Sequence, residues 1–281
     1  MRPVHRSILF AALGATCTLA ACDDGDATRE PDMGGEPGVG GEPGVGGEPA
    51  APDIVGAYTD DFDGRHAIGT TWSMEAGGDT LRFAFLQVDD AGRWGVAQND
   101  PANAFSPSLF SRFDWTTADD DALFFCQTAF DAESAAAAAA IPAADASDPA
   151  AGGCADFPWS RLRPVGPGIE GSWRDDYGTD HAVGAESWTQ SGDPAASTFR
   201  FVQVDPDAGW VVARNGAANA FSPGLWSRFD WARAGDDLWF CQTRYDAPTR
   251  ADAARAPPAD ASDPSTGGCS DFPWSHLAPA D

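Results

Sequence analysis

The sequence of 281 residues contains no lysine and only four asparagines. Its 17 basic residues are therefore all arginine and stand against 43 acidic residues, which gives a formal net charge of −26. A chain this acidic repels phosphate backbones, so nucleic acid is excluded as an expected partner. The sequence also lacks a glycine-rich phosphate loop, an HExxH pair and a serine-elbow motif. None of the enzyme classes that these motifs mark is therefore indicated.

An apolar segment near the N-terminus follows Arg2 and Arg6 and is too short to span a bilayer as a mature anchor. It ends in Leu19-Ala20-Ala21-Cys22, which resembles the lipobox of bacterial lipoproteins. The resemblance implies cleavage before Cys22 and acylation of its thiol and of the new amine, which would anchor the protein stably to a membrane. We therefore expect a signal peptide over residues 1–21 and a lipid-anchored protein of the bacterial cell envelope, periplasmic or surface-exposed. An ordinary secretory peptide that happens to end in cysteine is the alternative.

Residues 22–52 contain a repeated Gly-Gly-Glu-Pro-Gly-Val unit with no apolar face to bury. Such a segment is expected to stay disordered and to act as a tether with a typical reach of about 30 Å.

The rest of the chain consists of two similar segments. Residues 54–162 and 169–277 align at an offset of 115 or 116, as in "ALFFCQTAFDA" and "DLWFCQTRYDA". We call these segments copy 1 and copy 2, and we expect two domains, over residues 53–164 and 168–281. A full duplication is easier to explain by the avidity of two linked binding sites than by catalysis.

Each copy holds two cysteines, 28 residues apart. In an oxidising compartment an even set at repeated spacing predicts disulfides, here Cys126–Cys154 and Cys241–Cys269. A zinc site is the alternative, but the sequence has no Cys-x-x-Cys. We therefore expect no metal at these cysteines.

Alternation of apolar and polar residues, broken by turns, predicts an all-β fold made mainly of antiparallel strands. In copy 1 we expect six strands, near residues 55–60, 66–73, 81–89, 94–99, 109–115 and 123–128, then a short helix from Asp131 to Pro142 inside the disulfide loop. Such a domain closes as a small barrel or sandwich. Gly171 and Trp173, with Gly56 and Tyr58 in copy 1, resemble the entry strand of lipocalins and calycins, which implies a barrel.

The two runs that hold all four asparagines, residues 99–115 and 215–231, are candidate ligand sites. In the second, alternation places Trp226, Arg228 and Asp230 on one strand face, where an aromatic ring and polar groups would suit a sugar. The alternative is a solvent-facing strand whose arginine pairs with its aspartate.

In a simple meander the ends of the fourth and sixth strands meet at one rim, together with the loop after the fourth strand. Polar groups at the mouth of an apolar barrel are typical of small-ligand sites, although Asn and Ser before Pro are also common turn formers. The candidate ligand-binding residues from both arguments are Asn99, Asn103, Ser106, Arg112, Asp114, Gln127, Asn215, Asn219, Ser222, Trp226, Arg228, Asp230 and Gln242.

The opposite rim is expected to hold Asp60, Asp61 and His66, and Asp175, Asp176 and His181 in copy 2. The acid–base candidates among them are Asp61 with His66 and Asp176 with His181. An Asp–His pair is a candidate acid–base unit, but no Ser or Cys nucleophile stands in a recognisable context. A structural histidine is the favoured interpretation. The acidic run "DDFDG" would allow calcium, although copy 2 reads "DDYGT" there.

The sequence thus predicts a non-enzymatic, lipid-anchored envelope protein with no cofactor, whose two β-domains bind an extracellular ligand such as a glycan. A structural or protein-interaction role, with an envelope protein as partner, is the first alternative. An envelope hydrolase that uses the Asp–His pairs is the second.

Overall fold

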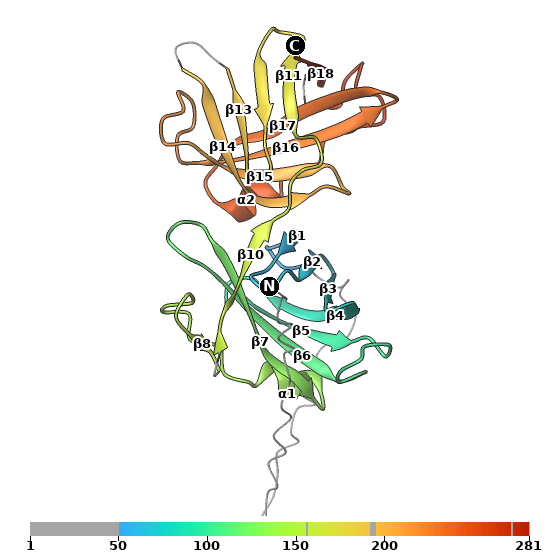
Figure 1. Ribbon diagram of the computed structural model, residues 1–281, viewed down its shortest axis with the longest axis vertical. Helices are drawn as coiled ribbons and strands as arrows, with labels where there is room; N and C mark the ends of the chain where they lie inside the picture. The colour runs from blue at the N-terminus through green and yellow to red at the C-terminus, as the bar shows by residue number, and fades with distance from the viewer. Residues whose placement is uncertain (1–50, 156, 192–194, 271, 281) are drawn as a thin grey trace, which may run out of the picture. The chain divides into compact units, whose positions relative to one another are not determined.

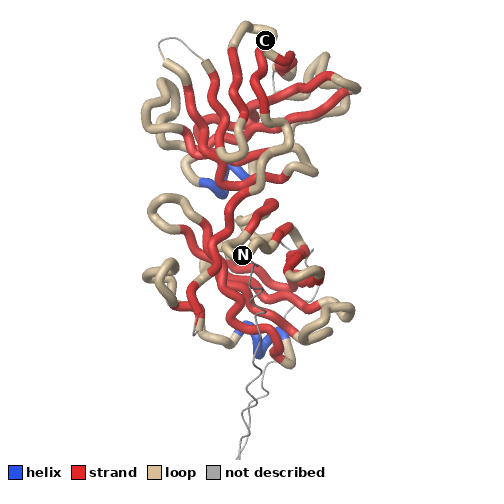
Figure 2. Tube along the Cα trace, viewed as in Figure 1, coloured by secondary structure: helices blue, strands red, loops and turns tan. Residues whose placement is uncertain are grey.

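The computed structural model describes residues 51–155, 157–191, 195–270 and 272–280. Each copy folds as a closed antiparallel barrel of eight strands (Figures 1 and 2). The proposed signal peptide, Cys22 and nearly all of the tether lie outside the described residues, so those expectations stay predictions. In the part that is described, no helix is both long and apolar enough to cross a bilayer.

The barrel of copy 1 is a meander in which each strand pairs with the next and the last closes on the first. Its strands are β1 (Gly56–Thr59), β2 (Arg65–Ile68), β3 (Thr71–Ala76), β4 (Asp79–Asp89), β5 (Trp94–Asn99), β6 (Phe110–Thr117), β7 (Leu123–Ala132) and β10 (Ser160–Pro164). Between β7 and β10 lie helix α1 (Ala135–Ala139) and the small hairpin of β8 (Gly153–Cys154) and β9 (Phe157–Pro158).

Copy 2 repeats this order and closes through the pairing of its first and last strands. Its elements are β11 (Gly171–Asp175), β12 (Asp180–Val183), β13 (Ser187–Gln190), β14 (Ser197–Asp205), β15 (Trp210–Asn215), β16 (Trp226–Ala234), β17 (Asp237–Ala247), α2 (Arg250–Ala254) and β18 (Ser275–Pro279). Residues 46–281 belong to one compact unit.

The expected all-β class and the two tandem domain folds are confirmed, but the expected six strands are wrong. The segment near 66–73 is two strands, β2 and β3, joined by a tight turn at Gly69 and Thr70. Alternation continues across a two-residue turn, so the sequence pattern does not reveal the break. The eighth strand, β10, follows the disulfide loop and closes the barrel by pairing with both β1 and β7.

Inward-facing aromatic residues fill each barrel. In copy 1 the ring of Trp72 stacks on Phe113 at 4.6 Å between centroids, and in copy 2 Trp188 stacks on Phe229 at 5.0 Å. Tyr58 is fully buried and its hydroxyl donates to the carbonyl of Ile54 at 3.0 Å. Trp173 makes the equivalent bond to Ile169. An aromatic residue with a polar atom, fully buried in copy 1 and partly buried in copy 2, therefore ties the start of each copy to its own barrel.

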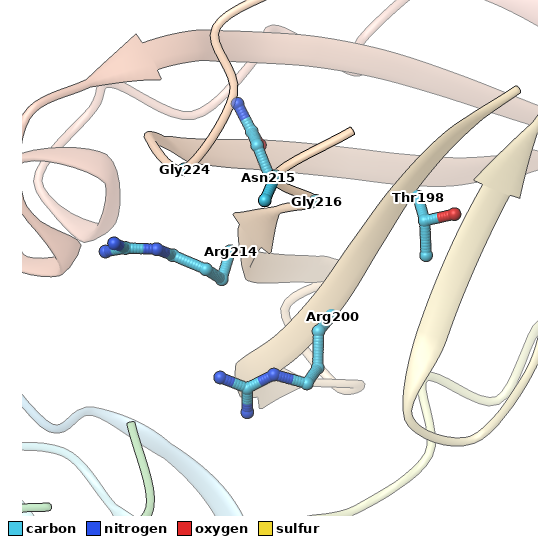
Figure 3. Close-up of a pocket in the computed structure, with 7 residues that line it drawn as sticks. Thr198, Arg200, Arg214, Asn215, Gly216 and Gly224 are labelled. Atoms are coloured by element: carbon cyan, nitrogen blue, oxygen red, sulfur yellow. The ribbon is translucent and has the colours of Figure 1, made fainter. Parts of the chain in front are cut away.

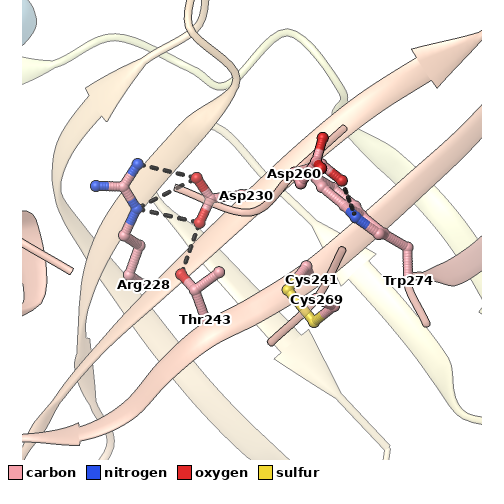
Figure 4. Close-up of a disulfide and its surroundings, with 7 residues drawn as sticks. All are labelled: Arg228, Asp230, Cys241, Thr243, Asp260, Cys269 and Trp274. Atoms are coloured by element: carbon pink, nitrogen blue, oxygen red, sulfur yellow. Dashed lines mark hydrogen bonds and ion pairs between the residues drawn. A yellow bond between two sulfur atoms is a disulfide. The ribbon is translucent and has the colours of Figure 1, made fainter. Parts of the chain in front are cut away.

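Both expected disulfides are present and link β7 or β17 to the loop that follows the helix (Figure 4). In each loop a buried tryptophan donates its indole N–H to the carbonyl 14 residues earlier, as Trp274 does to Asp260 at 2.9 Å. The expected helix start at Asp131 is wrong, because β7 continues to Ala132 and Ser134 caps α1. In copy 2 Thr249 caps α2, which ends before Pro257 as expected.

Candidate functional site

The first asparagine of each run, Asn99 or Asn215, lies inside the protein and joins three segments. Asn215 is buried, and its side-chain amide donates to the carbonyls of Ser222 at 2.9 Å and Tyr245 at 3.0 Å. Its Oδ1 accepts from the Ser227 hydroxyl, which in turn accepts from the amide of Gln242 at 3.1 Å. Asn215 and Gln242 are thus linked, but through the hydroxyl of Ser227, which was not among the residues expected at the rim. The same network in copy 1 consists of Asn99, Ser106, Ser111, Gln127 and Phe130.

The second asparagine of each run holds the neighbouring strand. Asn219 accepts from the backbone N–H of Thr198 at 2.9 Å and donates to the carbonyl of the same residue at 3.0 Å. Asn103 does the same with Arg82. All these amide groups are paired within the chain, so the structure gives them a role in shaping the loop. A role in binding a ligand stays a prediction for them.

Arg228 and Asp230 form a buried ion pair beneath α2 (Figure 4). Two guanidinium nitrogens of Arg228 contact the Asp230 carboxylate at 2.9 to 3.2 Å, and a third donates to the carbonyl of Ala254 at the end of α2. Thr243 donates its hydroxyl to Asp230 at 2.6 Å. The guanidinium also lies 4.9 Å from the ring centroid of Trp210. Copy 1 repeats this set with Arg112, Asp114, Thr128, Trp94 and the carbonyls of Ala139 and Ile141.

This arrangement corrects the expected exposure of the strand face. Alternation in β16 holds, because Phe229 and Trp231 belong to the barrel core while Trp226 belongs to a cluster outside it. The outer face is not solvent-facing, however, since Trp226, Arg228 and Asp230 are all buried. The ion pair expected from the spacing is present, but the helix covers it. A sugar platform on this face would require α2 to move.

The predicted Asp–His unit exists with a different carboxylate. His66 Nε2 lies 3.0 Å from Asp60 Oδ2, whereas Asp61 pairs with Arg163. In copy 2 His181 contacts Asp175 at 3.2 Å, and Asp176 accepts from the backbone N–H of His276. Pairing of the histidines with Asp61 and Asp176 is therefore wrong. The second aspartate of each pair instead accepts a hydrogen bond from the last strand of its barrel, β10 for Asp61 and β18 for Asp176.

Both nitrogens of each histidine ring are occupied. The indole N–H of Trp188, which can only donate, points at His181 Nδ1 at 3.0 Å. Nδ1 must therefore be the unprotonated nitrogen, and Nε2 carries the proton toward Asp175. Burial lowers the pKa of His181 from its ordinary 6.5, and the bond to Asp175 only partly opposes this. Because both ring nitrogens are already bonded inside the protein, His181 has no free nitrogen for proton transfer to a ligand, which supports the structural interpretation.

A pocket of about 500 Å³ opens at the end of the second barrel beside His181. We call it the mouth pocket. Its lining is contributed by the turn after β11, the strands β13 and β17, and the disulfide loop. The lining residues used below are Asp175, Tyr177, His181, Gln190, Gln242 and Phe272. Gln242 was expected at the opposite rim from His181, but β17 runs on to Ala247, so this glutamine lies mid-strand and reaches the same pocket.

The mouth pocket carries two exposed rings and unpaired polar atoms. The side chains of Tyr177 and Phe272 are 74% and 72% exposed. In the part of the chain that the structure describes, neither the Gln190 amide nor the Tyr177 hydroxyl has a hydrogen-bond partner. These residues were missed from the sequence, because Tyr177 and Phe272 stand alone outside the strands, Gln190 ends β13, and only the fold brings them together. The available signal was that both copies hold an aromatic residue at the two turn positions, as Phe62 and Phe157 in copy 1.

No metal site emerges among the described residues, where no group of three or more His, Cys, Asp or Glu side chains has suitable geometry. In the acidic run of copy 1, Asp60 uses one oxygen for the N–H groups of Phe62 and Gly64 and the other for His66. These bonds lower the pKa of Asp60 although its burial acts to raise it. The calcium suggestion gains no support from this geometry.

Comparison with known proteins adds no identity. No protein-family model, no curated protein and no solved structure matches the chain.

Proposed function

We propose that this protein is a lipid-anchored binding module of the bacterial envelope, and that copy 2 binds a carbohydrate in the mouth pocket. A volume of about 500 Å³ suits one or two sugar rings and falls within the usual range for small-ligand sites. Tyr177 and Phe272 offer ring faces to the apolar side of a sugar. Gln190, Gln242 and Tyr177 offer donors and acceptors to its hydroxyl groups.

The observation that carries this proposal is the unpaired amide of Gln190 in a pocket that is also lined by two exposed aromatic residues. When such a group binds a ligand hydroxyl, it gives up a hydrogen bond to water and no hydrogen bond within the protein. In copy 1 the position of Gln190 holds Met74, and that of Thr179 holds Gly64. The mouth of copy 2 is thus the better equipped for a polar ligand.

A glycan and polysaccharide array probed with residues 46–281 tests the proposal. We expect binding by the wild-type fragment and its loss in the Tyr177→Ala, Phe272→Ala double variant. The matched control is Phe221→Ala with Tyr245→Ala, which removes two rings of similar exposure, 82% and 61%, outside the mouth pocket. Gln190→Met, which introduces the residue of copy 1, should weaken binding about tenfold.

If the Phe221→Ala, Tyr245→Ala control lost binding while the Tyr177→Ala, Phe272→Ala variant kept it, the ligand would bind away from the mouth pocket and the proposed site would be refuted. A blank array from folded, disulfide-bonded protein would favour the alternative of a protein-interaction lipoprotein. One observation supports that alternative: both copies expose an aromatic ring at the same four positions of the repeat. These are Phe62 and Tyr177, Phe105 and Phe221, Phe130 and Tyr245, and Phe157 and Phe272.

A further inference from the structure

A second depression, of about 400 Å³, lies on the outer side of the second barrel at β14 and β15 (Figure 3). Its lining combines Arg200 and Arg214 with Thr198 and small residues such as Gly216. Figure 3 shows the two arginine side chains leaving adjacent strands and extending to the same side, away from Thr198. The depression does not share a lining residue with the mouth pocket.

The two arginines are direct cross-strand partners. Like charges placed opposite one another on a sheet destabilise it, and nothing in the alternation of β14 and β15 demands them. They also stand out in a chain with 43 acidic and 17 basic residues, where a carboxylate partner would be easy to supply. An anion bound close to the two guanidinium groups would offset their repulsion.

Their existing partners account for one of the two charges. Arg200 donates to the Asp121 carboxylate at 2.6 Å and to the carbonyl of Asp120 at 3.0 Å. The guanidinium of Arg214 instead lies over the ring of Trp226, 4.7 Å from its centroid. Within the described ranges no carboxylate comes within ion-pair distance of Arg214. Stacking holds the guanidinium plane but leaves its N–H donors free.

Copy 1 supplies an internal comparison, because it differs at all three positions. Ala84 replaces Arg200, Gln98 replaces Arg214 and Phe110 replaces Trp226, and Ala84 and Gln98 remain cross-strand partners. Both arginines and the larger aromatic surface under Arg214 are therefore features of copy 2 alone. The barrel folds in copy 1 without them, so the pair is not required for the fold.

We infer that Arg214, with Arg200 beside it, forms a binding site for a compact oxyanion: a carboxylate, sulfate or phosphate group. The planar fork of a guanidinium matches two oxygens of such a group. Arg200 adds a second positive charge. The net charge of −26 disfavours a long polyanion at a distance, so the ligand is a single anionic group or a sugar that carries one. This inference is independent of the carbohydrate proposed for the mouth pocket.

Titration of residues 46–281 with sodium phosphate, sodium sulfate and galacturonic acid, at constant ionic strength, tests the site. The readout is the NMR signal of the arginine Nε–H groups. We expect a saturable shift at Arg214 and an affinity at least about tenfold weaker in Arg214→Gln, which introduces the residue of copy 1. Arg200→Ala, again the copy 1 residue, should also weaken binding. The three probes separate a sugar acid from an inorganic anion.

The control is Arg244→Gln, which removes the same charge from an exposed arginine that pairs with Asp246. It should bind as the wild type does. The inference is overturned if none of the three anions gives a saturable shift, or if Arg214→Gln binds as tightly as the wild type. Equal weakening by Arg244→Gln would also overturn it, since the effect would then be one of overall charge.

Discussion

At the scale of single residues, the polar groups that looked like a ligand site have been turned inward. Asn215 uses both amide hydrogens and its oxygen in bonds within the chain. The side chain of Asn219 bonds to both the backbone N–H and the carbonyl of Thr198, as a paired strand would. The positive φ of Ser222, 47°, shows how sharply the loop must turn to present its carbonyl to Asn215. The residues shared by the two copies are thus explained in large part by the loop they build.

Replacement of the equivalent Asn99 by alanine should lower the free energy of unfolding by about 3 kcal/mol. The change leaves the carbonyls of Ser106 and Phe130 and the Ser111 hydroxyl without a partner in a buried place. Urea unfolding measures the loss. Gln98→Ala, at the exposed residue next to it, serves as the control and should change stability by no more than about 0.5 kcal/mol. Equal stability of the two variants would contradict the structural role of Asn99.

The neutral state of His181 predicts a pH dependence. Its pKa is lowered from 6.5 in the folded protein, mainly by burial, so the unfolded chain binds the proton more readily. Stability is then complete above about pH 6.5 and falls as the pH drops below it. Denaturant unfolding between pH 7.5 and 5.5 should show this fall, and His181→Gln should flatten it. A slope that survives His181→Gln would contradict the assignment.

At the scale of elements, each short helix is fixed by an ion pair on the strand below it. Five residues are too few for a stable helix in water, so α2 depends on its contacts. Arg228 donates to the carbonyl of its last residue, Thr249 caps its start, and Ala253 on its inner side is fully buried. One face of β16 therefore packs in the barrel core, and α2 covers the polar groups on its other face.

Arg228→Met should destabilise the protein by roughly 3–5 kcal/mol, because it leaves Asp230 charged and buried without its partner. The double variant Arg228→Met, Asp230→Leu should recover much of that loss. Arg244 and Asp246 form an exposed pair with the same spacing on β17, so Arg244→Met is a matched control with an expected change below about 1 kcal/mol. Thermal and urea unfolding give the comparison. A loss no larger than the control's would show that the covered pair contributes little.

At the scale of the whole molecule, one barrel design is used twice, with one disulfide in each. Each bond closes a loop of 28 residues, which the chain-entropy relation converts to roughly 3.6 kcal/mol of stability. Replacing Cys241 and Cys269 by alanine should destabilise copy 2 by about that amount. Calorimetry of the two paired-cysteine variants tests this. An unchanged transition in both would mean that the disulfides do not stabilise the barrels.

The membrane anchor is a prediction for the complete chain. Expressed in a bacterium that processes lipoproteins, the protein should incorporate labelled palmitate and partition with membranes, because two or three acyl chains anchor stably. Cys22→Ala should abolish both. Cys17→Ala, inside the signal peptide, is the control and should leave both intact. Labelling that persists without Cys22 would refute the lipobox.

The sequence by itself determined the duplication, the all-β class and both cysteine pairings, because each is written in local spacing that the repeat displays twice. It also led to the Arg228–Asp230 pairing, since strand alternation places these two residues on one face. Tertiary structure alone decided which polar groups remain open to a ligand. Burial of Arg228 depends on where α2 packs, and the mouth pocket depends on turns more than 60 residues apart, such as those of Tyr177 and Phe272. Barrel closure by β10 and β18 brings such distant segments together, and no local pattern encodes that contact.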